Sequence, residues 1–134
     1  MASRKKKSRP RRRSNPASRN ELREQLATIR QIHITVIGRT SGRRIRLPVW
    51  FVPQGTGLLL LPVRGSDTQW YRNVLRNTVV RVSARGLEAE FRAAPIRRAT
   101  SVSSVIRKFG RNYGARIVKQ LYFKFDVAVR LRPV

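Results

Sequence analysis

The alternation of apolar and polar residues along the chain predicts a protein built mainly of strands. Apolar residues occupy every second position over 32–36 and again over 45–51, which is the pattern of a strand with one buried face. Leu58–Leu61 is apolar at every position, as in a strand buried on both faces. Six segments in all are predicted as strands, at residues 32–36, 45–51, 58–61, 80–82, 87–93 and 127–131.

Apolar residues spaced three and four apart predict helices around these strands. The expected helices are residues 20–29, capped by Asn20, a segment from Ser66 or Asp67 to Asn77, and the segments 100–109 and 113–121. Gly110 separates the last two, and residues 53–57 are expected to form a loop. The expected fold class is α+β, mainly β: a six-stranded antiparallel barrel with peripheral helices.

Charge divides the chain into a tail and a domain. The 134 residues contain 31 Lys and Arg against 6 Asp and Glu, a net charge of +25. Residues 1–19 have almost no apolar side chains and no acid, so we expect a disordered tail there and a domain over 20–134. The tail holds nine cations that could bind a polyanion: Arg4, Lys5, Lys6, Lys7, Arg9, Arg11, Arg12, Arg13 and Arg19. Residues 21–134 still carry +16, so the domain itself should also attract anionic partners.

The residues needed for self-contained catalysis are scarce. The chain has no Cys, no metal-binding cluster of side chains, and a single histidine, His33, which we interpret as an ordinary strand residue. Glu88 and Glu90 are interpreted as ion-pair partners of Arg81 or Arg92 rather than an acid–base pair. No catalytic residue is therefore assigned, and any reaction should depend on a bound cofactor. The apolar runs are too short to span a membrane and no secretory signal is recognisable, so a cytoplasmic location is expected.

Two segments carry candidate binding residues. The turn Gly38–Gly42 and the arginines after it offer backbone N–H groups, hydroxyls and guanidinium groups that suit a phosphate; the alternative is a plain hairpin with solvated arginines. The aromatic residues Trp70 and Tyr71 could stack on a planar ring or simply pack in the core.

These two segments resemble the deazaflavin-dependent nitroreductase and quinone-reductase branch of the split-barrel flavin-binding proteins. The resemblance rests on five pieces in the family's order: Gly38-Arg39-Thr40-Ser41-Gly42, Pro48, Val63-Arg64-Gly65-Ser66, Trp70-Tyr71-Arg72-Asn73-Val74 and Asn77-Thr78. It covers roughly residues 30–133. The chain departs from the family at Val63, where a Ser near the cofactor ring is usual, and at Ser66, which replaces a second Gly.

The resemblance implies a six-stranded split barrel that binds deazaflavin (F-420) or FMN and passes hydride to a quinone or nitro-type acceptor. Carried over position by position, the cofactor site would contain Arg39, Thr40, Ser41, Arg43, Pro48, Arg64, Gly65 and Trp70. The resemblance also suggests a homodimer. Whether the protein is an enzyme stays open at this point. The alternative is a nucleic-acid-binding or ribosome-associated basic protein that uses the same fold without catalysis.

Overall fold

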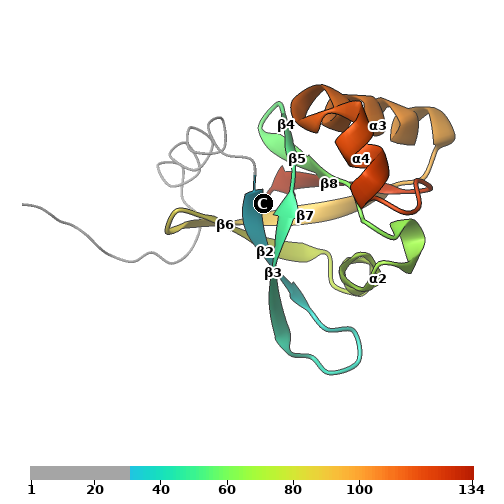
Figure 1. Ribbon diagram of the computed structural model, residues 1–134. Coiled ribbons are helices and arrows are strands. Elements are labelled where there is room, and N and C mark those ends of the chain that lie inside the picture. The colour runs from blue at the N-terminus through green and yellow to red at the C-terminus, as the bar shows by residue number, and fades with distance from the viewer. Residues whose placement is uncertain (1–30) are drawn as a thin grey trace, which may run out of the picture.

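The computed structural model describes residues 31–134 as a curled antiparallel sheet with helices outside it (Figure 1). The strands are β2 (Gln31–Ile37), β3 (Arg44–Trp50), β4 (Val52–Gln54), β5 (Gly57–Leu60), β6 (Val79–Ala84), β7 (Leu87–Ile96) and β8 (Ala128–Pro133). The helices are the 3-10 turn η2 (Gly65–Asp67), α2 (Gln69–Arg76), α3 (Ala99–Tyr113) and α4 (Ala115–Leu121). The sheet order is β3-β2-β6-β7-β8-β5-β4. The mainly β class with peripheral helices is confirmed.

The sheet has seven strands rather than the expected six, because Val52–Gln54, directly after the second expected strand, forms the additional strand β4. β3 pairs with β2 at one edge of the sheet, and β4 pairs with β5 at the other edge. Phe51, between these two strands, bonds through its backbone to the side chain of Tyr113. The Phe51 N–H donates to the Tyr113 hydroxyl at 3.3 Å, and this hydroxyl donates to the Phe51 carbonyl oxygen at 2.6 Å. One short bend thus carries the chain between the two edges and curls the sheet. β4 also overturns the expectation that residues 53–57 form a loop throughout.

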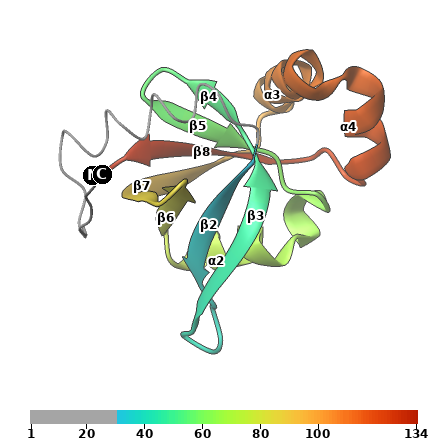
Figure 2. The same cartoon turned by 60° about the vertical axis from the view of Figure 1, so that its left-hand side comes forward.

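Two hydrophobic cores pack against the curled sheet, and α2 lies on a different side of the sheet from α3 and α4 (Figure 2). The inner core fills the barrel and is closed by Trp70, Tyr71 and Val74 of α2. The outer core lies between the sheet and the helices α3 and α4. β5 contributes to both, because Leu58 and Leu60 belong to the inner core whereas Leu59 belongs to the outer one. The prediction of a strand buried on both faces is therefore confirmed.

The break between the last two helices lies at Gly114 and not at Gly110. Gly110 is within α3, and the helix ends because Gly114 adopts φ +99°, a backbone conformation that glycine reaches without strain. The buried residues Val102, Val105, Phe109 and Tyr113 keep helical spacing across Gly110. Packing against the outer core therefore carries α3 one turn further than expected.

Two sequence predictions fall outside the described residues. These are the basic tail over 1–19 and the helix over 20–29. Within residues 31–134, no helix is long and apolar enough to cross a membrane.

Candidate functional site

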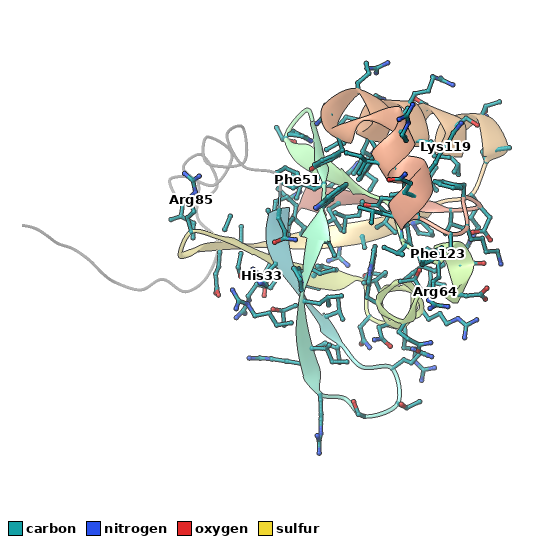
Figure 3. All side chains as sticks on the ribbon, in the orientation of Figure 1. His33, Phe51, Arg64, Arg85, Lys119 and Phe123 are labelled. Atoms are coloured by element: carbon teal, nitrogen blue, oxygen red, sulfur yellow. The ribbon has the colours of Figure 1, made fainter. Side chains whose placement is uncertain are left out.

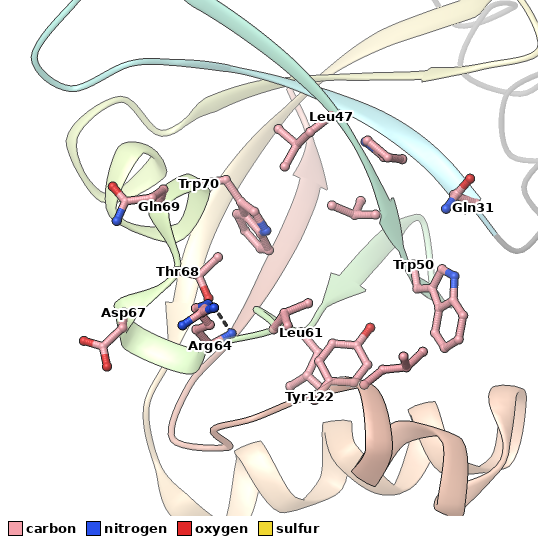
Figure 4. Close-up of a pocket in the computed structure, with 14 residues that line it drawn as sticks. Gln31, Leu47, Trp50, Leu61, Arg64, Asp67, Thr68, Gln69, Trp70 and Tyr122 are labelled. Atoms are coloured by element: carbon pink, nitrogen blue, oxygen red, sulfur yellow. Dashed lines mark hydrogen bonds between the residues drawn. The ribbon is translucent and has the colours of Figure 1, made fainter.

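An open pocket of about 760 Å³ lies between β3, α2 and the start of the segment that follows α4 (Figure 4). It is lined by Gln31, Leu47, Pro48, Val49, Trp50, Leu61, Val63, Arg64, Asp67, Thr68, Gln69, Trp70, Leu121 and Tyr122. Most of these side chains are apolar or aromatic. Such a surface suits a largely apolar, planar ligand with a small number of polar groups.

Three of the residues expected to bind a cofactor line this pocket: Pro48, Arg64 and Trp70. Trp70 is almost completely buried, and its ring points between Leu47 and the backbone near Arg64 in the close-up view (Figure 4). The interpretation of Trp70 as a core residue is confirmed, and the same side chain also lines the pocket. Its neighbour Tyr71 is in the inner core and does not line the pocket.

Arg64 is held at the pocket edge by contacts on two sides. Its backbone N–H donates to the Thr68 hydroxyl at 2.8 Å. Its guanidinium carbon lies 5.7 Å from the centre of the Phe123 ring, a cation–π contact. Within residues 31–134 the guanidinium forms no ion pair. It therefore remains available to an anionic group of a ligand.

Gly65 is expected at the site, and the structure shows why a glycine stands there. Its φ is +56°, and a Cβ would collide with Asp126 Oδ1. Asp126 accepts hydrogen bonds from the Ser66 N–H at 2.9 Å and from the Ser66 hydroxyl at 2.6 Å. The close approach at Gly65 thus lets the turn η2 dock on the segment that leads into β8.

Ion pairs between Lys124 and two carboxylates hold the solvent-facing side of the turn η2. Lys124 lies 3.2 Å from Asp67 and 3.7 Å from Asp126. Its hydrogen bond and charge hold the pKa of Asp67 below the usual range, and Asp67 in turn raises the pKa of Lys124. For Asp126, burial acts to raise the pKa, but the Ser66 hydrogen bonds and Lys124 together bring it below the usual range. Both carboxylates therefore stay ionised and structural, and neither is suited to act as a general acid.

The Gly38–Gly42 loop lies beside α2 but outside the pocket lining. Arg39 donates from its backbone N–H and from Nη1 to Asn73 Oδ1, at 3.1 and 2.7 Å, and from Nη2 to Gln69 Oε1 at 2.8 Å. Asn73 is buried, and its partner Arg39 lies 34 positions earlier in the chain. The loop is thereby tied to the helix that carries two pocket residues, Gln69 and Trp70.

The other loop residues expected at the site face solvent. Ser41 Oγ accepts from the Arg43 N–H at 3.1 Å, a local turn contact, and Thr40 and Arg43 are exposed. Arg39, Thr40, Ser41 and Arg43 do not line the pocket. A phosphate held by them would have to extend from a ligand whose ring lies in the pocket.

An aromatic wall on the far side of the pocket was not foreseen from the sequence. Trp50 stacks on Tyr113 with ring centres 4.3 Å apart, and Tyr122 lies 6.4 Å from Trp50. Burial raises the pKa of Tyr122, with the nearby Tyr113 adding to it. Its hydroxyl has no hydrogen-bond partner within residues 31–134 and points into the pocket (Figure 4). The sequence carried a weak signal, since five of the ten aromatic residues of the full chain fall between 109 and 125.

His33, Glu88 and Glu90, to which no catalytic role was assigned, lie outside the pocket lining. His33 is half-buried on β2 and does not line the pocket (Figure 3). Glu88 and Glu90 lie 3.8 and 3.6 Å from Arg81, so Arg81 is an ion-pair partner of both, as one of the two interpretations predicted. In the described part of the chain, no group of three or more His, Cys, Asp or Glu could hold a metal ion.

The curled antiparallel sheet, with α3 and α4 packed outside it, defines a split-barrel protein. The chain belongs to a family described as uncharacterized protein conserved in bacteria (DUF2255), whose model matches residues 22–129. No curated protein matches the sequence.

Solved structures with the same fold have different ligands. HutZ, the heme storage protein of Vibrio cholerae, has a TM-score of 0.66 at 20% identity, over 86% of this chain and 89% of HutZ. The F-420-H2-dependent reductase FDR-A has a TM-score of 0.60 at 16% identity, over 76% and 93% of the two chains. A structure described as a domain-swapped dimer has a TM-score of 0.62 at 15% identity, over 87% and 96%. At these identities the comparison shows the fold alone.

Proposed function

We propose that the protein binds a flavin-type cofactor, either deazaflavin F-420 or FMN, in the 760 Å³ pocket and acts as an oxidoreductase on a quinone or nitro-type acceptor. The observation that carries the proposal is an apolar pocket with an unpaired guanidinium at its edge. When bound, such a cofactor supplies hydride transfer, which the side chains of this chain cannot supply themselves. One of the structural neighbours is a reductase that depends on F-420-H2.

The residues of the pocket have distinct parts in this proposal. Trp70, Leu47 and Val63 offer apolar surface for a flat ring. Arg64 would bind an acidic group of the cofactor, and the exposed loop with Thr40, Ser41 and Arg43 would receive its phosphate. Gly65 allows the backbone of η2 to stay close to the pocket edge. Arg39 would act indirectly, because its bonds to Asn73 and Gln69 position the loop against α2.

Heme, the ligand named for some structural neighbours, fits the donor set less well. Heme iron is held in proteins by His, Cys, Met or Tyr side chains. Of these, the pocket lining contains only Tyr122. The donor chemistry therefore supports a flavin-type ligand over heme.

The test is a titration of the purified full-length protein with F-420, FMN and heme, followed by absorbance or fluorescence. We expect saturable binding of one of the first two, weakened about tenfold by Arg64→Gln, because a charge-assisted hydrogen bond is lost. Arg76→Gln, which removes an exposed arginine at the other end of α2, is the control and should bind as the unaltered protein does. Saturable binding of heme alone, or of none of the three, would contradict the proposal.

A second candidate function is nucleic-acid binding, favoured by the charge of the described domain. Residues 31–134 contain 20 basic and 4 acidic residues, and Asp67, Glu88, Glu90 and Asp126 all lie in ion pairs. Contact would be made with the phosphate backbone, by the N-terminal cations and by arginines of the domain. Nucleic acid that copurifies before nuclease treatment, with an affinity that falls steeply with salt, would support this role.

The oligomeric state and the cellular location are separate from the cofactor proposal. We infer that the protein forms a homodimer, because β3 is an edge strand whose apolar residues Leu47 and Val49 are only half-buried and because one structural neighbour is a domain-swapped dimer. Analytical ultracentrifugation tests this state directly. The cytoplasmic location stays a prediction from the sequence.

A further inference from the structure

Four of the large apolar side chains that solvent reaches lie together at the mouth of the pocket. They are Val63 (38% exposed), Ile117 (44%), Leu121 (47%) and Phe123 (70%). Ile117 and Leu121 are four residues apart on α4 and so share one face of it. The Phe123 N–H donates to the Val63 carbonyl at 2.7 Å, which joins the two segments. We call these four residues the mouth patch. Clustered exposure of this kind marks an interaction surface.

Positive charge lies next to the mouth patch. From Arg97 to Lys124 the sequence has eight basic residues and no acid: Arg97, Arg98, Arg107, Lys108, Arg111, Arg116, Lys119 and Lys124. Arg116 and Lys119 are exposed on α4 and form no ion pair within the described part of the chain. Arg64 lies against the Phe123 ring, and Lys119 extends from α4 above it (Figure 3). The rim therefore offers unpaired cations next to exposed apolar side chains.

Charge and polarity together select the partner. A second copy placed patch to patch would bring Arg116 and Lys119 of both molecules together, which repulsion opposes. A nucleic acid would neutralise the cations, but it would leave the aliphatic side chains of Val63, Ile117 and Leu121 without an apolar partner. An anionic lipid bilayer satisfies both features, because its headgroups attract cations and its interface accepts apolar side chains.

We propose that the mouth patch and its basic rim dock the protein on the surface of an anionic membrane. The contact is peripheral, with Phe123, Ile117 and Leu121 entering the interface and Arg116 and Lys119 among the headgroups. Val63, Arg64 and Leu121 also line the pocket. Docking therefore sets the pocket mouth against the bilayer, and an apolar ligand dissolved in the lipid reaches the pocket without crossing water. This inference depends on the surface and not on the identity of the cofactor.

The test uses the full-length protein and sedimentation with vesicles of phosphatidylcholine, with and without phosphatidylserine. The variant Ile117→Ser, Leu121→Ser, Phe123→Ser removes the apolar contacts and leaves every charge in place. Ile45→Ser is the matched control, since Ile45 is 40% exposed and lies on the distant β2–β3 hairpin. Circular dichroism checks that both variants are folded, as expected for changes at exposed positions.

We expect the unaltered protein and Ile45→Ser to bind the anionic vesicles equally, within about twofold, and the triple variant to bind about tenfold more weakly. The difference should persist at about 1 M salt, where the basic N-terminal residues present in all three proteins are screened. Equal binding by the triple variant and the unaltered protein overturns the proposal. If the triple variant instead loses self-association or RNA binding while its vesicle binding is unchanged, the patch is an interface for a second copy or for RNA, and the proposal is also overturned.

Discussion

The two hydrophobic cores of this protein differ in how their residues hold together. The inner core is built from strand residues that alternate along the chain, such as Ile32, Ile34 and Val36, with α2 closing it. In the outer core, aromatic rings contact one another, and every ring pair found in the described residues is there. Both cores reach the pocket, the inner one through Trp70 and the outer one through Trp50 and Tyr122. The inner core thus sets the shape of the barrel, whereas the outer core adds an aromatic wall to the site.

The largest effect is expected from removing the ring at the centre of the outer core. Phe109 is completely buried, with ring centres 5.8 Å from Tyr113 and 6.1 Å from Tyr122. Phe109→Ala should lower the free energy of unfolding by about 3–5 kcal/mol, because a large cavity is left. Urea denaturation measures this. In the inner core, Phe91→Ala should lower the free energy of unfolding by a comparable amount but leave ligand affinity intact. If Phe91→Ala weakens ligand binding and Phe109→Ala does not, the division between the two cores is wrong.

A smaller effect should follow from removing one hydroxyl group. Tyr113→Phe keeps the stacking on Trp50 but leaves the buried Phe51 carbonyl without its donor. We expect a loss of about 1–3 kcal/mol in the free energy of unfolding, the cost of an unsatisfied buried polar group. Tyr71→Phe is the control, since the buried Tyr71 hydroxyl has no hydrogen-bond partner within residues 31–134. A loss in the control as large as in Tyr113→Phe would contradict the role given to the bend at Phe51.

The smallest effect at neutral pH is expected from Tyr122→Phe, because no described residue bonds to that hydroxyl. The difference should appear in alkali. Burial raises the pKa of Tyr122 above its ordinary value of 10.0, so above pH 10 the unfolded chain releases a proton that the folded protein retains. Stability is then lost as the pH rises. Urea midpoints compared at pH 8 and pH 11 should fall less in Tyr122→Phe than in the unaltered protein; an equal fall would show that Tyr122 titrates normally.

The same contrast explains what could be predicted from the sequence. Alternation identified strands that build the inner core, including β2 and β7, because a period of two is a local property of the chain. The three-residue strand β4 was missed because Pro53 and Gly55 suggest a loop and only pairing with β5 makes it a strand. The helix break was placed at Gly110 because both glycines are equally permissive locally, and only the packing of Tyr113 decides between them.

The site was predictable on one side only. Pro48, Arg64 and Trp70 lie in motifs and were found, and all three line the pocket. Trp50 and Tyr122 form the opposite wall through contacts between segments far apart in the sequence. The Arg39–Asn73 pair was likewise hidden, because the two residues are 34 positions apart and their bond depends on how the loop lies against α2.

The bend at Phe51 also bears on the order in which the protein folds. The two edges of the sheet are joined by a residue whose main-chain partner is a side chain 62 positions later in the chain. Local hairpins such as β2–β3 and β6–β7 need only short loops to close, whereas this bend gains its partner when α3 arrives. The curl of the sheet is therefore completed late, and the mouth of the pocket takes its final form in the same step.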